Sequence, residues 1–180
     1  MIRLSNIEAD ETGATLLAHL QAQTFREAYE GVHTSADLDA YCAANYTTTA
    51  ARELLESPLS ICRTGALDDQ IAGYYVVRME DAPVSIEFTA AELKQIYVLS
   101  AAFGSGLGGA LFDDAIEQIQ PRGREGVWLC VSDLNERAKR FYEKLGFERF
   151  GSGPTLVVGK DRLPSSILAR RIAFDTNNSA

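Results

Sequence analysis

The chain has 180 residues, of which 46% are hydrophobic and 23% charged, which predicts one large globular domain over residues 1–174 and a flexible tail at 175–180. No apolar run approaches the ~20 residues that cross a bilayer, and the start lacks the apolar stretch of a secretory signal, so we expect a cytoplasmic protein without a membrane partner. The net charge of −8 disfavours nucleic acid as a partner, because its phosphates are repelled, and favours cationic small molecules.

Three helices are expected in the first third of the chain. Apolar residues recur at helical spacing over residues 14–31. Ser35 is the predicted N-cap of a second helix over 35–46, with acidic residues in its first turn. A polar run opens the third helix over 47–57, and Pro58 stops it.

The pattern then changes to strands. Branched and aromatic residues over 59–65, 69–80 and 91–99 predict three successive strands, the first two paired as a hairpin. Helices and strands alternate in the second half of the chain. The elements predicted there are a helix over 107–120, a strand over 126–132, a helix over 135–147, and a closing hairpin formed by 155–160 and 166–172. This order predicts a mixed α/β fold.

The cysteines and histidines are too few and too scattered for a metal site. Cys42, Cys62 and Cys130 are widely spaced without any CxxC pair, and His19 and His33 lie far from them. We therefore expect three free thiols and no metal. Cys130 falls in the apolar stretch VWLCV, which predicts a buried strand residue.

Four glycines crowd the junction between the strand over 91–99 and the helix over 107–120. They are Gly104, Gly106, Gly108 and Gly109. A strand–loop–helix unit directs the free N–H groups of the first helical turn out of the loop, where they and the helix dipole attract anions. The glycines would let phosphate oxygens reach the backbone, although a tight turn packed on the sheet would also explain them.

Two other phosphate loops fit the sequence less well. A nucleoside-triphosphate loop needs Lys followed by Ser or Thr after its last glycine, and Ala110 stands there. The dinucleotide pattern GxGxxG is matched, but the following strand over 126–132 ends without the acidic residue that this site requires.

Two motifs in order carry a resemblance to a known family. The loop Phe103–Gly108 is similar to the Q/R-x-x-G-x-G/A phosphate loop of the GNAT acyltransferases, which move an acyl group from acyl-coenzyme A to an amine. Residues 135–147 match their Asn-x-x-Ala-x-x-Phe-Tyr-x-Lys-x-Gly-Phe element. The resemblance covers nearly the whole chain. Shorter stretches resemble bacterial polyamine (spermidine-type) N-acetyltransferases.

The resemblance implies a fold, a cosubstrate and a set of site residues. The fold is a central mixed, mostly antiparallel twisted sheet flanked by helices, with splayed parallel strands at the coenzyme site. Acetyl-CoA would be the cosubstrate, and Tyr142 the general acid that reprotonates the leaving thiolate. The implied coenzyme-binding residues are Ile96, Tyr97 and Val98 for pantetheine, Gly104, Ser105, Gly106, Leu107, Gly108 and Gly109 for pyrophosphate, and Asn135 and Lys144.

The sequence departs from the family pattern at two positions. Phe103 replaces the polar residue that opens the phosphate loop, which predicts weaker coenzyme binding. Lys94 replaces an acidic residue that the polyamine-type relatives carry, and Glu92 is retained. We hypothesise that Glu92 accepts the amine proton, directly or through water. An ordinary strand carboxylate paired with Lys94 explains it equally well.

The acceptor is expected between the first two helices and the nearby strand ends. Glu27, Tyr29, Glu30 and His33 would receive a cationic amine there, although charges on a solvated helix face need no function. The leading hypothesis is transfer of acetyl to a small primary amine such as a polyamine. Protein N-terminal or lysine acetylation, and a coenzyme-A-binding sensor without activity, are the alternatives. The strand around 166–174 could pair two copies into a homodimer.

Overall fold

The computed structural model describes residues 1–173, and the expected tail at 175–180 lies outside them. Five α-helices and two short 3-10 turns lie in this range. They are α1 (Glu11–Tyr29), α2 (Ser35–Asn45), α3 (Thr48–Glu56), η1 (Ser100–Ala102), α4 (Leu107–Ile119), η2 (Gln120–Arg122) and α5 (Glu136–Lys144). Within the same range, no helix is both long enough and apolar enough to cross a bilayer.

The strands form one large sheet and a small hairpin. They are β1 (Ile2–Asn6), β2 (Ser60–Leu67), β3 (Gln70–Arg78), β4 (Ala90–Val98), β5 (Gly126–Ser132), β6 (Glu148–Ser152), β7 (Leu156–Val158), β8 (Asp161–Leu163) and β9 (Ser165–Arg171). The seven-stranded sheet has the order β1-β2-β3-β4-β5-β9-β6, and β7 pairs with β8. Among the neighbouring strands of this sheet within residues 1–173, only β4 and β5 run parallel, which confirms the expected mixed, mostly antiparallel sheet.

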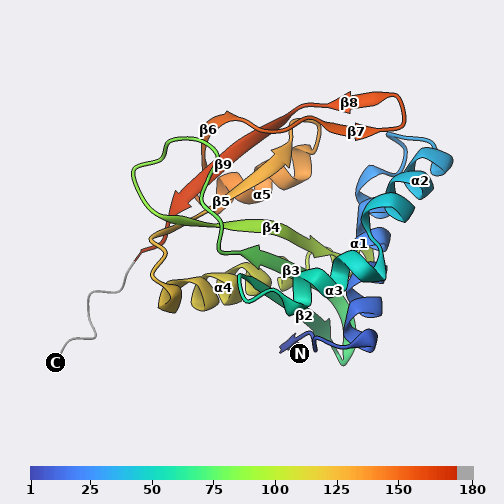
Figure 1. Ribbon diagram of the computed structural model, residues 1–180, viewed down its shortest axis with the longest axis horizontal. Coiled ribbons are helices and arrows are strands. Elements are labelled where there is room, and N and C mark those ends of the chain that lie inside the picture. The colour runs from blue at the N-terminus through green and yellow to red at the C-terminus, as the bar shows by residue number, and fades with distance from the viewer. Residues whose placement is uncertain (174–180) are drawn as a thin grey trace.

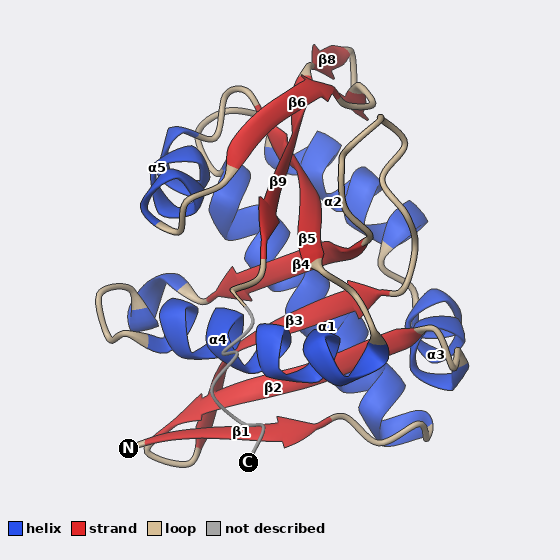
Figure 2. Cartoon of the chain, turned by 90° about the vertical axis from the view of Figure 1, so that its left-hand side faces the viewer, coloured by secondary structure: helices blue, strands red, loops and turns tan. Residues whose placement is uncertain are grey.

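The sheet twists strongly at its centre. In Figure 2, β5, β9 and β6 turn away from the direction of β1 to β4. β4 and β5 pair only from Ala90 to Glu92 on one strand and from Gly126 to Trp128 on the other. Beyond these residues the two strands separate, and the gap between them positions the site described below.

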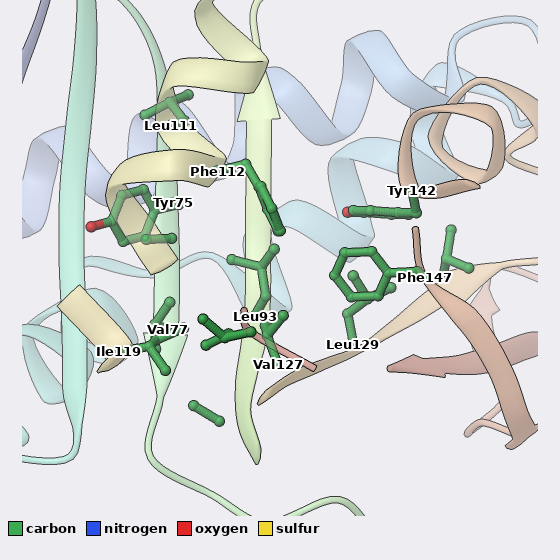
Figure 3. Close-up of a cluster of buried hydrophobic side chains, with 14 of the residues drawn as sticks. Tyr75, Val77, Leu93, Leu111, Phe112, Ile119, Val127, Leu129, Tyr142 and Phe147 are labelled. Atoms are coloured by element: carbon green, nitrogen blue, oxygen red, sulfur yellow. The ribbon is translucent and has the colours of Figure 1, made fainter. Parts of the chain in front are cut away.

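Helices cover both faces of the sheet because its central strands are apolar on both sides. Tyr74 and Val76 of β3 pack under α1 and α3, while Tyr75 and Val77 pack under α4. Figure 3 shows the second of these layers, in which Leu111 and Phe112 of α4 lie against β3 and β4. This alternation follows from the two-residue period of a strand.

The C-terminal hairpin was predicted with the wrong partners. The stretch 155–160 does not pair with 166–172; instead β7 folds back on β8 through Gly159 and Lys160. β9 pairs with β5 and β6, and the β7–β8 hairpin extends toward α2 (Figure 1). A two-residue turn with Gly159 at a φ of +58° explains the short hairpin.

Three smaller expectations also need correction. Thr34, not Ser35, caps α2, because its Oγ1 accepts a hydrogen bond from the Asp37 amide at 3.2 Å. The edge strands β1 and β6 were not predicted, since they are short and largely exposed. Cys130 is exposed rather than buried, because β4 has already parted from β5 at this level.

Candidate active site

A cavity of about 770 Å³ opens where β4 and β5 separate. Its wall is formed by α1, α2, β4, α4, β5, α5, the loop before α4 and the segment between β6 and β7. The sequence-predicted site residues in this wall are Glu27, Tyr29, Ile96, Tyr97, Val98, Gly104, Gly106, Leu107, Gly108, Gly109, Asn135 and Tyr142. The others, Glu30, His33, Glu92, Ser105 and Lys144, lie outside it.

The glycine loop presents unpaired backbone donors to the cavity. Ser105 Oγ accepts the Leu107 amide at 3.2 Å, and the Ala110 amide donates to the Gly106 carbonyl at 3.1 Å. The four neighbouring amides have no hydrogen-bond partner within residues 1–173. They belong to Gly104, Gly106, Gly108 and Gly109. Four free N–H groups at the positive end of the 13-residue helix α4 make a strong site for an anion.

Two of these glycines are required by the backbone itself. Gly104 and Gly106 have φ angles of +80° and +86°, in the left-handed region that a Cβ makes costly. At Gly109, a Cβ would meet nothing within 4 Å. The backbone conformation therefore explains the glycine at 106, whereas neither backbone conformation nor packing explains the glycine at 109.

This contrast predicts opposite effects of the same substitution. Gly106→Ala should lower the free energy of unfolding by about 1–2 kcal/mol, because Ala is strained at this φ. Gly109→Ala should leave it unchanged or raise it by up to about 1 kcal/mol, because Ala favours the helix. Chemical denaturation of the two variants measures both values. Equal losses would contradict the assignment of strain to Gly106.

The separated strands leave a backbone edge without a strand partner. The β4–β5 ladder ends at Glu92 and Trp128, while β3 continues to pair with the other edge of β4 as far as Val98. The edge of β4 that faces β5 therefore carries free backbone groups at Ile96, Tyr97 and Val98 within the cavity wall. Such an edge can accept an extended amide-containing chain as an added strand.

Tyr142 is a buried residue whose hydroxyl lies at the same cavity. Asn135 caps α5, since its Oδ1 accepts the Ala138 amide at 3.1 Å, and the helix then directs Tyr142 inward. The side chain packs between Phe141 and Phe147 and is 9% exposed. Figure 3 shows its hydroxyl directed toward β4. Burial holds the pKa of Tyr142 well above its usual value, so the hydroxyl keeps its proton at neutral pH.

Comparison with known proteins identifies the family. The sequence pattern of the acetyltransferase (GNAT) family matches residues 14–147. The chain belongs to this family. An uncharacterised N-acetyltransferase of Mycobacterium tuberculosis is 31% identical over 142 residues, which cover 78% of this chain and 86% of that protein. The family resemblance seen in the sequence is thus confirmed.

Solved structures confirm the GNAT fold. The PaiA N-acetyltransferase of Thermoplasma acidophilum, crystallised with coenzyme A, superposes with a TM-score of 0.74 over 96% of this chain and 99% of that chain, at 15% identity. The ribosomal-protein-S18-alanine N-acetyltransferase of Escherichia coli superposes with a TM-score of 0.64 over 100% and 99%, at 20% identity. Both likenesses concern the fold alone.

This GNAT chain carries a cation beside its glycine loop that sequence reasoning missed. Arg137, in the first turn of α5, lies in the cavity wall with its guanidinium carbon 3.2 Å from the centre of the Phe103 ring. This is a cation–π contact. Phe103 precedes Gly104, so the pair brings a positive charge to the position where the family pattern has Gln or Arg. In the sequence Arg137 is only a basic residue of a predicted helix, and nothing there indicates its contact with Phe103.

Lys144, the cation expected near the phosphates, lies elsewhere. It is exposed at the far end of α5, about 10 Å along the helix axis from Arg137. It does not contribute to the cavity wall. Its contact with a phosphate stays a prediction.

The expected acidic acceptor surface is largely engaged by the protein itself. The Glu27 carboxylate accepts the Ser100 amide at 2.7 Å and the Gln23 side-chain amide at 3.1 Å. Glu30 is exposed outside the cavity. The His33 side chain is 1% exposed and its Nδ1 lies 2.8 Å from Asp161 Oδ2, which ties the α1–α2 loop to the β7–β8 hairpin.

Two other predicted acceptor-side residues are placed differently. Tyr29 lies in the cavity wall. Burial raises the pKa of its hydroxyl, and a hydrogen bond with Ser132 offsets part of this rise. Glu92 is half-buried outside the wall. Burial raises its pKa, and the nearby positive charges of Lys94 and Arg78 oppose this rise.

Proposed function

We propose that this GNAT protein transfers the acetyl group of acetyl-CoA to the primary amine of a small molecule. One juxtaposition carries the proposal: the unpaired amides at the start of α4, the free edge of β4 and the protonated hydroxyl of Tyr142 all face one cavity. An anion site and an amide-binding edge serve the coenzyme, and a proton donor serves the departing thiolate.

The residues present fit acetyl-CoA. The amides of Gly104, Gly106, Gly108 and Gly109 would bind the pyrophosphate, and Arg137 would add a positive charge beside it. The free edge of β4 at Ile96–Val98 would bind the amides of the pantetheine arm. The bound thioester supplies the acetyl carbon that the amine attacks.

The chain's own contributions are then positioning and proton transfer. The amine must lose a proton before its nitrogen can bond to the acetyl carbon. The C–S bond of the thioester then breaks, and the sulfur leaves as a thiolate. Tyr142 would donate its proton to the departing thiolate. Glu92 is our candidate for the proton acceptor, and it would act through water because it lies outside the wall. Neither role requires a covalent enzyme intermediate.

A small acceptor is favoured over a protein by the hairpin that covers part of the acceptor side. Pro154, Thr155 and Leu156 contribute to the wall, and the β7–β8 hairpin packs its Val158 and Leu163 against α1 and α2. This hairpin leaves less open surface on the acceptor side for a peptide, which binds along an extended groove.

A Glu92→Gln variant tests the proton acceptor. The base must be ionised to work, and its pKa is raised, so the wild-type rate should fall as the pH drops through a value above 4.5. The variant should be slower by about 100-fold and should lack this acidic limb. Initial rates between pH 5 and 9 measure both. An unchanged rate and pH profile would eliminate Glu92 from the mechanism.

The proposed function is tested by thiol release from acetyl-CoA. The acceptor panel contains spermidine, spermine, amino acids, aminoglycosides, simple aryl amines and short peptides, and calorimetry measures acetyl-CoA binding in parallel. Turnover with small amines but not peptides is the expected result. Turnover with peptides alone would favour protein acetylation. Tight binding without any turnover would favour a coenzyme sensor, and no binding would refute the cosubstrate.

A further inference from the structure

We propose that the acceptor amine also carries a carboxylate, which Lys94 binds, and an apolar or aromatic body. This inference rests on the proposed acetyl transfer and names the substrate class for the same cavity. It differs from the polyamine that the narrower sequence resemblance implied. Three observations carry it: the placement of Lys94, the balance of charge in the wall, and the aromatic lining.

Lys94 is directed to the cavity by an irregularity in β4. Gln95 lies opposite Val76 and Leu93 lies opposite Val77. Lys94, between them, therefore has no opposite residue on β3. This is a β-bulge, a feature that redirects a side chain from a strand. Lys94 is exposed, contributes to the cavity wall, and makes no ion pair within residues 1–173.

The charge in the wall is positive on balance. Its charged residues are Glu27, Lys94 and Arg137. Both oxygens of Glu27 already accept hydrogen bonds, and Arg137 lies on Phe103 beside the phosphate loop. Lys94 is therefore the charged group left for the acceptor. The second ammonium of a polyamine would be repelled by it, whereas a carboxylate would form a charge-assisted hydrogen bond.

Glu92 does not neutralise Lys94 in the cavity. The two charges are close enough for Lys94 to lower the pKa of Glu92, and both act on the exposed thiol of Cys130. The carboxylate of Glu92 nevertheless lies outside the wall and beyond ion-pair distance. Lys94 thus faces the cavity with its charge available.

The remaining lining on the α1–α2 side suits an apolar body. Phe25 stacks on Tyr41 with ring centres 4.4 Å apart, and Tyr46 meets the same ring edge-on at 5.6 Å. Leu156 and Pro154 extend this surface from the other side. A flat or apolar side chain is stabilised by such a wall through burial and ring contacts. Amine, carboxylate and aromatic body together define an aromatic or apolar amino acid.

The test compares two amines that differ only in the carboxylate. Phenylalanine and phenethylamine are used as acceptors with acetyl-CoA, and spermidine is the polyamine reference. Wild type should show the highest kcat/KM with phenylalanine. In Lys94→Met, the ratio of kcat/KM for phenylalanine to that for phenethylamine should fall about tenfold, the value of one charged hydrogen bond. Lys94→Glu should shift preference further, toward spermidine.

A matched control removes the same charge elsewhere. Lys160→Met lies in the exposed β7–β8 turn, outside the cavity wall, and should leave the ratio unchanged. An unaltered ratio in Lys94→Met, or turnover restricted to carboxylate-free amines, would overturn the acceptor assignment and leave acetyl transfer standing. No thiol release with any amine of the wider panel would refute acetyl transfer itself, and the acceptor assignment with it.

Discussion

Tyr142→Phe is expected to lower kcat by about 100-fold or more, because it removes the proton that the leaving thiolate needs. Acetyl-CoA binding should be retained, since the ring still packs between Phe141 and Phe147. The hydroxyl makes no hydrogen bond to residues 1–173, so its loss should cost the fold little. Steady-state kinetics with calorimetric binding of acetyl-CoA measure the two effects separately.

The pH profile adds a second readout for Tyr142. A general acid works only while protonated, and the raised pKa means that Tyr142 keeps its proton beyond the ordinary tyrosine value of about 10. The wild-type kcat should therefore show no loss from this residue as the pH rises to 10. A decline that begins near pH 8 and disappears in Tyr142→Phe would contradict the assigned environment of this hydroxyl.

Tyr75→Phe provides the matched control. Tyr75 is also a buried tyrosine, but its hydroxyl donates to Asp114 at 2.7 Å between β3 and α4, away from the cavity wall. Its replacement should lower the free energy of unfolding by about 1 kcal/mol and leave kcat unchanged. If Tyr142→Phe behaved in the same way, Tyr142 would be a structural residue and the proton donor would have to be sought elsewhere.

Local periodicity allowed much of the fold to be predicted from the sequence. The helix α4 after the glycine loop and the strands β2 to β4 are long segments whose apolar spacing is visible without any partner. The largest failure concerns strand pairing. β9 was assigned to a hairpin because it follows β7 closely, yet it pairs with β5 and β6. Strand partners depend on contacts far apart in sequence, which periodicity does not encode.

The part of the site that consists of backbone amides could be predicted from the sequence. The part that depends on which groups the side chains contact could not. The glycine spacing indicated free amides around the start of α4, and these amides are unpaired. Glu27 also lies in the wall, but no sequence signal shows that the Ser100 amide already occupies its carboxylate. The bulge that frees Lys94 depends likewise on the register between β3 and β4. Both outcomes follow from non-local geometry.

Arg137→Met is expected to raise the Kd for acetyl-CoA by about 10- to 100-fold, the range for losing a hydrogen bond to a charged group. Phe103 cannot contact a phosphate as Gln or Arg would, but its ring, 45% exposed, holds the guanidinium of Arg137 at 3.2 Å. The aromatic residue therefore orients a cation from α5 toward the loop. Acetylpantetheine lacks the pyrophosphate and the nucleotide, so kcat/KM with this donor should be nearly the same in both proteins.

Two variants separate this local effect from a general change in charge. Arg140→Met removes one positive charge from the exposed face of the same helix, outside the wall, and should leave the Kd for acetyl-CoA nearly unchanged. Phe103→Leu removes the ring under the guanidinium and should weaken binding less than Arg137→Met. Because the ring acts through Arg137, the double variant should bind no more weakly than Arg137→Met alone. Additive losses of acetyl-CoA affinity would mean that Phe103 and Arg137 act independently. If Arg140→Met lost as much affinity as Arg137→Met, the effect of Arg137 would come only from the overall charge of the protein.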